Sequence, residues 1–260
     1  MHAPQFQVSL AQNAQDVRAA QRLRYRVFVQ ELGGDGAMVD HDAGLETDRF
    51  DPWFDHLILR DLAISDTDSD IGADAQVVGV YRLLREDQAA QAGQFYSEGE
   101  YDLTPLRQSG RRLMELGRSC VEQRYRGGQA LFHLWQGLAG YVADHDIDVL
   151  FGVASFHGTD PRALAAPLSL LHHRHLAPSA LRARSKHYQS MDLIDVEALD
   201  RKAALLQMPA LIKAYLRLGG CVGDGAYIDH AFNTTDVCLI MDTARLSQAH
   251  RDLYSPGRRG

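Results

Sequence analysis

The sequence has little cysteine, no long apolar run and no excess of basic charge, and each shortage excludes a class of protein. The three cysteines, Cys120, Cys221 and Cys238, lack Cys-x-x-Cys spacing, so we expect structural thiols in a reducing compartment rather than metal ligands. No apolar segment is long enough to span a bilayer, and the N-terminus lacks a basic region followed by an apolar run. We therefore expect a cytoplasmic protein. The net charge of −7 predicts no nucleic-acid partner.

Motifs for nucleotide binding and for serine hydrolysis are also missing. The chain has neither Gly-x-Gly-x-x-Gly nor Gly-Lys-Ser/Thr, which argues against a dinucleotide site or a P-loop. The stretch GVASFHG around Ser155 lacks the Gly-x-Ser-x-Gly elbow, so Ser155 is not expected to be a hydrolase nucleophile. Cys120 stands in an apolar strand-like stretch and is expected to be buried filler.

Apolar periodicity predicts a single mixed α/β domain. The stretch AQDVRAAQRLRYRVFVQ has helical spacing, QVVGVYRLL alternates like a strand, and a strand-helix-strand unit in the middle of the chain implies a parallel pair. The predicted helices cover residues 14–30, 128–143, 161–173 and 210–218; the strands cover 56–61, 76–84, 112–122, 147–155 and 236–241; and loops cover 33–51 and 86–110, with a mobile basic segment at 180–191.

Gly127 and Gly128 stand between the strand over 112–122 and the helix that we expect to begin at Gly128. Glycine lets a backbone approach a ligand closely, and the free amides at a helix N-terminus attract anions such as phosphate. This pattern is typical of a site for a phosphate-bearing cofactor. A tight bend without a ligand explains the glycine pair equally well.

The stretch RYRGG at this turn resembles the acyl-donor-binding turn of the GNAT acyltransferases, whose usual form is Gln/Arg-x-x-Gly-x-Gly/Ala. The resemblance implies that Arg124, Arg126, Gly127 and Gly128 hold the acyl donor. The last position of the pattern falls on Gln129, which leaves fewer small residues for a nucleotide pyrophosphate. A carrier-protein phosphopantetheine arm, which has one phosphate, suits the turn better.

Other stretches are similar to two groups of GNAT-like enzymes. RLRYRVFVQELG, VVGVYRLL and MELGRSCV resemble signatures of acyl-homoserine-lactone synthases, whereas LFGVASFHG and the stretch over 208–242 look more like ornithine N-acyltransferases of the hemolysin-like acyltransferase group. The resemblance extends from Arg22 to Asp242. It implies one GNAT-like domain over residues 1–260, in which a mixed central sheet is flanked by helices. The core would cover about 14–160, and a C-terminal helix-strand extension about 161–245.

Acyl transfer to an amine needs a base, because the amine arrives protonated at neutral pH. Glu115 lies on the strand before the turn, and the resemblance implies that it is catalytic. From the pattern alone, a buried ion pair with Arg118 or Arg82 is the simpler interpretation. Gly117 stands where the related signature has serine, and we expect a backbone amide near it to stabilise the oxyanion.

Arg24, Arg82 and Arg118 lie on elements patterned for burial. A guanidinium group matches a carboxylate with two parallel hydrogen bonds, so each of these arginines is a candidate for the carboxylate of an amino-acid substrate. Arg22 and Arg26 on the same helix are expected to be solvated.

The stretch DRFDPWFDH supplies candidates for the side-chain ammonium of ornithine. Asp51 is the residue that we select, with Asp48 and Asp55 as neighbours. Asp51 precedes proline, so it can equally be a turn residue. Phe28 is a candidate for lining the substrate pocket, although aromatic residues at such positions are often plain core.

Ser155 and Phe156 end the second strand of the predicted parallel pair. In GNAT enzymes two such strands splay apart, and the resemblance implies that the pantetheine arm enters there. We therefore predict that Ser155 and Phe156 contact the acyl donor.

The stretch LHHRHLAPSALRARSKHY is basic in an otherwise acidic protein. It predicts a surface that docks an acidic carrier protein or anionic lipid headgroups, unless it is only a solvated loop. The histidines at 172, 173 and 175 have no convincing helical pair and no carboxylate as third ligand, so we expect no metal. The residues selected for carrier-protein docking are Arg174, Arg182, Arg184 and Lys186.

The resemblance implies an N-acyltransferase that moves a 3-hydroxyacyl chain from acyl carrier protein to the α-amine of ornithine, which gives lyso-ornithine lipid. We expect no tightly bound cofactor, and peripheral contact with the inner face of the cytoplasmic membrane, because the product is amphiphilic. Three alternatives stay open: an acyl-homoserine-lactone synthase using S-adenosylmethionine, an acyltransferase for another amino acid such as glutamine or glycine, and a non-catalytic carrier-protein or lipid-binding module.

Overall fold

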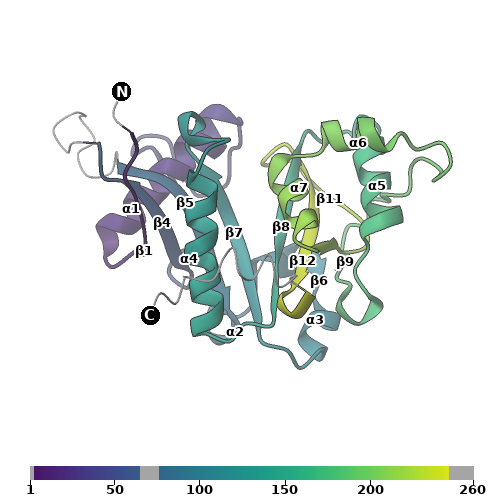
Figure 1. Ribbon diagram of the computed structural model, residues 1–260, viewed down its shortest axis with the longest axis horizontal. Helices are drawn as coiled ribbons and strands as arrows, with labels where there is room; N and C mark the ends of the chain where they lie inside the picture. The colour runs from purple at the N-terminus through teal and green to yellow at the C-terminus, as the bar shows by residue number, and fades with distance from the viewer. Residues whose placement is uncertain (1–2, 65–75, 246–260) are drawn as a thin grey trace. The chain divides into compact units, whose positions relative to one another are not determined.

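The computed structural model describes residues 3–64 and 76–245, and its helices and strands are drawn in Figure 1. The chain divides into two compact units. Unit 1 comprises the described residues 3–64, 76–84 and 116–146, and unit 2 comprises 85–115 and 147–245. The acidic stretch DTDSDIGAD (residues 66–74), which we predicted to join two strands, lies outside the described residues.

Unit 1 is built on strands with the order β1-β4-β5-β7. β1 pairs antiparallel with β4, and β4 pairs antiparallel with β5, as the two alternating stretches predict. The strands are β1 (Phe6–Leu10), β4 (Asp55–Asp61), β5 (Val77–Arg85) and the part of β7 (Leu113–Val121) that begins at residue 116.

Two helices cover opposite faces of these strands in unit 1. α1 (Ala14–Arg24) starts at Asn13, whose side chain accepts hydrogen bonds from two backbone amides of the first turn. One face packs Ile58 and Val80 against α1. On the other face Gly79 leaves room for Leu134 of α4 (Ala130–Asp144). Strand alternation explains this division, because neighbouring residues of β4 and β5 point to opposite faces.

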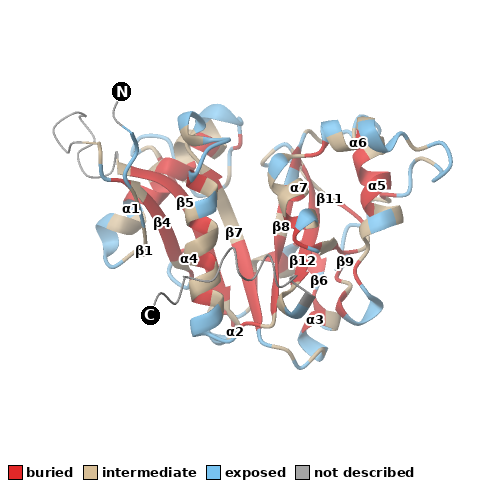
Figure 2. Ribbon diagram, viewed as in Figure 1, coloured by how far each residue is buried: buried red, intermediate tan, exposed pale blue. Residues whose placement is uncertain are grey.

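Unit 2 is built on a long antiparallel pair, β8 (Val149–His157) and β12 (Thr234–Asp242). The first three residues of β7 add a parallel ladder to β8, which confirms the predicted parallel pair. β10 (Cys221–Val222) and β11 (Tyr227–Asp229) both pair with β12. Figure 2 shows that buried residues gather along the central strands of each unit.

Helices and short strands complete unit 2. α5 (Ala165–His175) packs against α6 (Arg201–Gln207), and β6 (Tyr101–Asp102) forms a two-residue ladder with β9 (Arg184–Ser185). The remaining helices are α2 (Glu86–Ala92), α3 (Thr104–Gln108) and α7 (Ala210–Arg217), with 3-10 turns η3 (Tyr96–Gly99) and η5 (Ser179–Leu181).

The prediction of one loop over residues 86–110 is wrong, because this stretch contains α2, η3, β6 and α3. Its helices are too short to show a clear apolar period. β1, α6, β10 and β11 were not predicted either, and the loop predicted over 33–51 contains the short paired strands β2 (Val39–Asp40) and β3 (Leu45–Glu46). The basic stretch over 180–191 holds η5 and β9, and its backbone is bonded to Glu100 and Ala226 of the same unit.

The mixed α/β class with a mixed sheet flanked by helices is confirmed. The boundaries between the two units fall at 84/85, 115/116 and 146/147, not near residue 160, where the sequence suggests that a core gives way to an extension. The number of domains stays a prediction.

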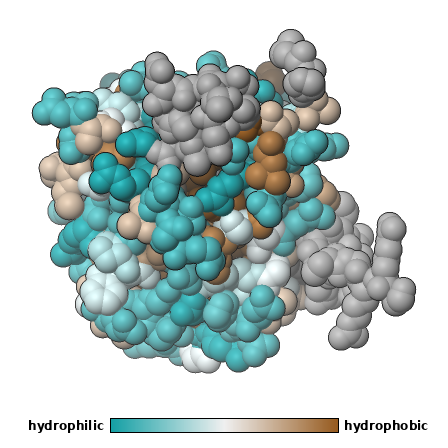
Figure 3. Space-filling model, turned by 90° about the vertical axis from the view of Figure 1, so that its left-hand side faces the viewer, coloured by the Kyte–Doolittle hydropathy of each residue, from teal (hydrophilic) through white to brown (hydrophobic). Residues whose placement is uncertain are grey.

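The face of the protein in Figure 3 is mostly hydrophilic, with scattered apolar residues.

Candidate active site

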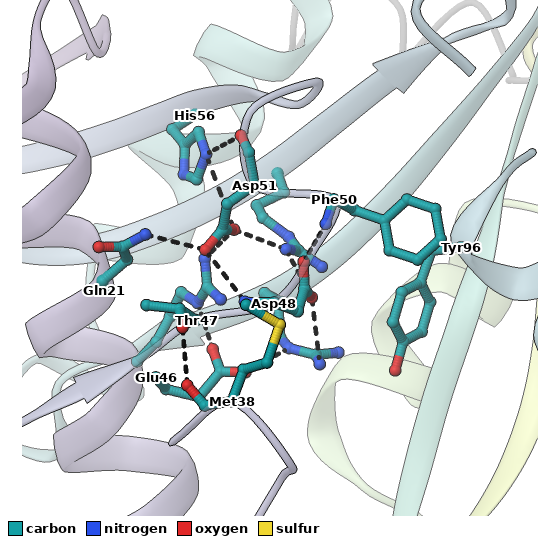
Figure 4. A network of polar contacts seen from close by, with 12 residues as sticks. Gln21, Met38, Glu46, Thr47, Asp48, Phe50, Asp51, His56 and Tyr96 are labelled. Atoms are coloured by element: carbon teal, nitrogen blue, oxygen red, sulfur yellow. Dashed lines mark hydrogen bonds and ion pairs between the residues drawn. The ribbon is translucent and has the colours of Figure 1, made fainter. Parts of the chain in front are cut away.

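Unit 1 contains a buried cluster of charged side chains that come from four separate segments. Arg24 ends α1, Arg82 lies on β5 and Arg118 on β7. The carboxylates come from Glu46 on the short strand β3 (Leu45–Glu46), and from Asp48 and Asp51 in the turn that follows it. Figure 4 shows the acids pointing toward one another, with dashed contacts to the guanidinium groups between them.

The six side chains form a closed ring in which acids and arginines alternate, and we call it the charge ring. Arg24 pairs through Nε with Glu46 and through Nη1 with Asp51 Oδ1 at 2.6 Å. Arg82 Nη1 lies 2.7 Å from both Asp51 Oδ1 and Asp48 Oδ2.

Arg118 closes the charge ring. Its Nε lies 3.1 Å from Glu46 Oε1, and its Nη2 lies 3.4 Å from Asp48 Oδ2. Three positive and three negative groups balance, as buried charges require.

The ring carboxylates are held in their charged form. Burial alone would raise the pKa of Asp51, but the charges of Arg24 and Arg82 and their hydrogen bonds outweigh it and hold that pKa well below its usual range. For Glu46 and Asp48 too, burial is the largest single effect and raises the pKa, but the neighbouring arginines together outweigh it, so the pKa of each carboxyl group is lowered. These carboxylates are therefore acceptors for cations and N–H groups rather than proton donors at neutral pH.

Two residues beside the charge ring were not among the predicted site residues. Gln21 Nε2 donates to Asp51 Oδ2 at 2.9 Å, and His56 Nε2 donates to the backbone oxygen of Asp51 at 3.2 Å. His56 is buried, and burial lowers its pKa against the opposing charge of Asp51. The signal was available, because strand alternation places His56 on the same face as Ile58, which packs against α1.

The backbone at the charge ring departs from regular geometry in two places. α1 continues from Arg24 into a π-helix, η1 (Tyr25–Glu31), where Leu32 N bonds Val27 O at 3.2 Å, five residues back. π-Helical turns are rare in proteins, and those that occur are often found at functional sites. Arg118 has φ +46° in the middle of β7, a conformation that costs free energy in a non-glycine residue. Both irregularities adjoin members of the ring.

The predicted substrate residues in unit 1 come together. Arg24, Asp51, Arg82 and Arg118 are all members of the charge ring. Phe28 lies in η1, partly buried against the core that α1 covers. Their contacts with a substrate stay a prediction.

Glu115 and Gly117 fall in different units. In unit 2 Glu115 is 1% exposed and accepts hydrogen bonds from the backbone amides of Tyr96 and Ser97, at 2.7 Å each, and from the Ser97 hydroxyl. In unit 1 a Cβ added at Gly117 would lie 3.7 Å from Arg82 Nη2 and from the Phe54 ring. The catalytic role of Glu115 stays a prediction.

The predicted acyl-donor turn is built differently from the strand-to-helix turn that we expected. The 3-10 turn η4 (Gln123–Tyr125) follows β7, and α4 begins at Ala130, two residues after Gly128. Gly127 has φ +74°, a conformation that favours glycine, and nothing lies within 4 Å of a Cβ added there. The glycine pair is thus separated from the first amides of the helix.

The arginines of this turn make ion pairs of their own within unit 1. Arg124 Nε lies 2.8 Å from Glu122 Oε1, and Arg126 Nη2 donates to Glu31 Oε2 at 2.7 Å. Arg124 remains 60% exposed. A phosphate would therefore find Arg124 more accessible than Arg126.

The second acyl-donor pair lies in unit 2. Ser155 and Phe156 are near the end of β8, beyond the residues that pair with β7. Ser155 is exposed, whereas Phe156 is 1% exposed and buried.

Three of the four predicted docking residues donate side-chain hydrogen bonds within unit 2. Arg174 is exposed on α5. Arg182 Nε donates to Ala177 O at 2.7 Å, Arg184 Nη1 to Asp224 Oδ2 at 2.5 Å, and Lys186 Nζ to Glu98 O. Their place on one basic surface for a carrier protein stays a prediction.

The prediction for Cys120 is confirmed. Cys120 lies in the core of unit 1, and burial raises the pKa of its thiol to about 12. A thiol in this state is a poor nucleophile.

Comparison with known proteins places this chain in a family. A model described as the acetyltransferase (GNAT) domain matches residues 23–136. The L-ornithine N(alpha)-acyltransferase of Rhodobacter capsulatus is 59% identical over 250 residues, which are 96% of this chain and 95% of the relative. The chain belongs to the L-ornithine N(alpha)-acyltransferase family. The Brucella abortus protein of the same name is 45% identical over 253 residues, 96% of this chain and 88% of that protein.

Solved structures agree with the GNAT-like fold of this family member. FeeM, an N-acyl amino acid synthase from uncultured soil microbes, has a TM-score of 0.53 at 12% identity and covers 93% of each chain. BjaI, a CoA-dependent acyl-homoserine lactone synthase, has a TM-score of 0.52 at 13% identity. The match covers 98% of this chain and 92% of the BjaI chain. At such low identity the likeness concerns the fold alone.

Proposed function

We propose that this chain transfers an acyl group to the α-amine of L-ornithine. The observation that carries the proposal is the 59% identity, over 96% of the chain, to a protein named for this activity. The 45% identity to a second protein of the same name supports the same amino acid. An acyltransferase that positions a charged amino acid also accounts for a buried charge ring, whose burial is costly for stability alone.

We propose that the chemistry is direct attack on a thioester. The amine nitrogen of ornithine forms a bond to the carbonyl carbon, the carbon–sulfur bond breaks, and the thiolate leaves and takes up a proton. A base must remove a proton from the ammonium group before the nitrogen can attack. Glu115 is our candidate for that base, and Gly117 marks the segment whose backbone amide would stabilise the oxyanion.

The charge ring gives each of its members a different proposed task. Arg24 and Arg82 have side chains that are 0% exposed, whereas Arg118 and Asp48 are each 15% exposed. We propose that Arg118 binds the substrate carboxylate and that Asp48 faces an ammonium group. Arg24, Arg82 and Asp51 then act as positioning residues that hold these two in place.

The acyl donor is proposed to be a 3-hydroxyacyl chain on acyl carrier protein. A carrier protein is acidic, and in unit 2 the exposed Arg174 offers a cationic group for its acidic side chains. In unit 1 the exposed Arg124 offers a cationic group for a phosphate. Such contacts would weaken as salt rises. None of the described helices is long and apolar enough to cross a membrane. Peripheral contact with the inner membrane face is proposed because the product is amphiphilic.

Mass spectrometry of one reaction tests the proposal. Purified protein is incubated with 3-hydroxyacyl carrier protein, a mixture of amino acids and S-adenosylmethionine. Acyl-ornithine is the expected product. An acyl-homoserine lactone, or the amide of a different amino acid, would contradict the assignment of ornithine, and carrier-protein binding without any amide product would contradict catalysis.

The role of Glu115 needs a matched pair of variants. Glu115→Gln removes the base, and we expect kcat to fall about 10²–10⁴-fold. The glutamine NH₂ would also face the amides of Tyr96 or Ser97, so structure is disturbed as well. Ser97→Ala is the control, because it removes one hydrogen bond and leaves the carboxylate. A pH–rate profile that keeps its acidic limb in Glu115→Gln would contradict the base assignment.

A further inference from the structure

Unit 2 brings two histidines and a carboxylate together at the end of α5. His172 and His173 are adjacent in the last turn of the helix, with ring centroids 5.3 Å apart and planes at 82°. Asp192 belongs to the loop between β9 and α6, and one ligand atom from each of the three residues lies within 4.8 Å of the others. The sequence prediction that no carboxylate is at hand is wrong, because the fold returns Asp192 to this helix.

The two carboxylate oxygens of Asp192 each face one imidazole. Asp192 Oδ1 lies 3.3 Å from His173 Nε2, and Asp192 Oδ2 lies 3.9 Å from His172 Nε2. The second distance is too long for a hydrogen bond. Zinc bonds to nitrogen and oxygen of about 2.0–2.2 Å, however, bridge ligand atoms that are about 3–4 Å apart.

Hydrogen bonds hold the loop against this side of α5. The hydroxyl of Ser169, which is 0% exposed, accepts from the backbone amides of Leu193 and Ile194 at 3.0 Å each. Ser169 precedes His172 and His173 by three and four residues, so the three side chains share one helix face. The buried Ser169 hydroxyl thus holds the loop that carries Asp192 next to the two imidazoles, so the three groups are arranged before any metal binds.

The two imidazoles differ in their present hydrogen bonds. His172 Nδ1 is buried, and it has no hydrogen-bond partner among residues 3–64 and 76–245. A neutral histidine that is protonated on Nδ1 presents Nε2 as a lone pair, so His172 Nε2 is the atom that would bind a metal. His173 differs, because its Nε2 now bonds Ile194 O at 2.9 Å, and metal binding would replace that hydrogen bond.

We propose that His172, His173 and Asp192 form a site for a divalent transition-metal ion, with zinc as the ion of choice and water in the remaining position. Two imidazoles and one carboxylate are a donor set that zinc accepts. The metal would fasten the loop over 186–200 to α5 and so add a cross-link within unit 2. This inference is independent of the proposed acyl transfer.

Metal titration of tag-free, chelator-treated protein tests the site. We expect Co²⁺ to give a visible absorption spectrum of four-coordinate type, and one equivalent of Zn²⁺ to abolish it and raise the unfolding temperature. His172→Ala and Asp192→Asn should each weaken Zn²⁺ binding about tenfold or more, since removing even an outer partner costs about 10–100-fold.

His175→Ala is the matched control, because it removes a histidine from the same turn that is outside the three-residue group. Its Zn²⁺ affinity should stay within about twofold of the wild type. Zn²⁺ affinity that is unchanged in His172→Ala and Asp192→Asn, or lost equally in His175→Ala, would overturn the proposal. So would the absence of any Zn²⁺ binding to the full chain.

Discussion

The two units satisfy buried carboxylates in different ways. In unit 1 the acids of the charge ring are matched by guanidinium groups from distant segments, as with Asp51 between Arg24 and Arg82. In unit 2 Glu115 accepts hydrogen bonds from two consecutive backbone amides and a hydroxyl. A charge matched by side chains depends on every partner, whereas a charge matched by the backbone depends on the local chain path. The two arrangements should therefore respond differently to substitution.

The largest effect is expected at Asp51. Asp51→Ala leaves Arg24 and Arg82 facing each other without the acceptor that they share, and breaking a buried ion pair costs about 3–5 kcal/mol. Urea unfolding followed by circular dichroism measures the loss. Asp87→Ala, at an ion pair whose Asp87 side chain is 63% exposed, is the control and should change stability by at most about 0.5 kcal/mol. Equal losses in the two variants would contradict the importance of the ring.

Glu115→Ala should destabilise the protein less than Asp51→Ala. It leaves the amides of Tyr96 and Ser97 without their carboxylate acceptor, at a cost of about 1–3 kcal/mol. The same urea titration gives the number. A loss larger than that of Asp51→Ala would reverse the comparison between side-chain and backbone matching.

Acid should weaken unit 1 through the charge ring. The folded-state pKa values of Glu46, Asp48 and Asp51 are lowered, so the unfolded chain binds more protons below about pH 5. The free energy of unfolding contributed by the ring is therefore complete above that pH, and it is lost as pH falls through the folded-state values.

His56 adds to the same trend at higher pH. Burial lowers its pKa, so the unfolded chain takes up the proton first, below about pH 6.5, and stability falls as pH drops from there. Urea titrations at intervals between pH 7.5 and 4 test both effects. His56→Gln should flatten the profile between about pH 6.5 and 5, and an unchanged slope in that variant would rule out the contribution of His56.

Arg118 should matter for both substrate binding and stability. Arg118→Gly leaves Glu46 and Asp48 without one guanidinium partner, which destabilises unit 1, but it also relieves the backbone conformation at φ +46°, which offsets part of that loss. We expect KM for ornithine to rise about tenfold or more, as lost charged hydrogen bonds of about 1.5–3 kcal/mol imply. Steady-state kinetics with the acyl donor held constant check this, and an unchanged KM would assign the carboxylate elsewhere.

The smallest effect is expected at Gly117. A Cβ there would meet Arg82 and Phe54 at ordinary contact distances of 3.7–3.8 Å, whereas a Cβ at Gly220 would meet the backbone oxygen of Tyr215 at 2.8 Å. Gly117→Ser should therefore change stability by less than about 0.5 kcal/mol. Gly220→Ala should cost distinctly more, and urea unfolding of both variants, followed by circular dichroism, measures the difference. Severe destabilisation by Gly117→Ser would show that glycine is required at this position.

Sequence patterns predicted the long elements well. The strands β4, β5, β7, β8 and β12 and the helices α1, α4 and α7 all follow clear apolar periods, because each buries one face or both. The short elements between residues 86 and 110 have too few turns to show a period. Their positions depend on contacts made after folding, such as the hydrogen bonds from Tyr96 and Ser97 to Glu115.

The candidate site was predictable in part. Three arginines on buried elements indicated a charged site, and the acids around residue 51 were chosen because they were nearby in sequence. Glu46 was missed, because nothing local marks it as buried, although it pairs with both Arg24 and Arg118. Asp192 was missed for the same reason. Pairings between segments far apart in sequence are set by the fold and leave no periodic trace.

The π-helix after Arg24 has a consequence for how this segment can change length. Its hydrogen bonds close one residue further along the chain than those of an α-helix, as the bond from Leu32 to Val27 shows. The segment therefore holds more residues per turn than an α-helix does. If one residue were deleted from it, the remaining residues could continue α1 as ordinary α-helix. An insertion or deletion here would rotate Phe28 around the helix axis, whereas Arg24, which precedes the segment, would stay in place.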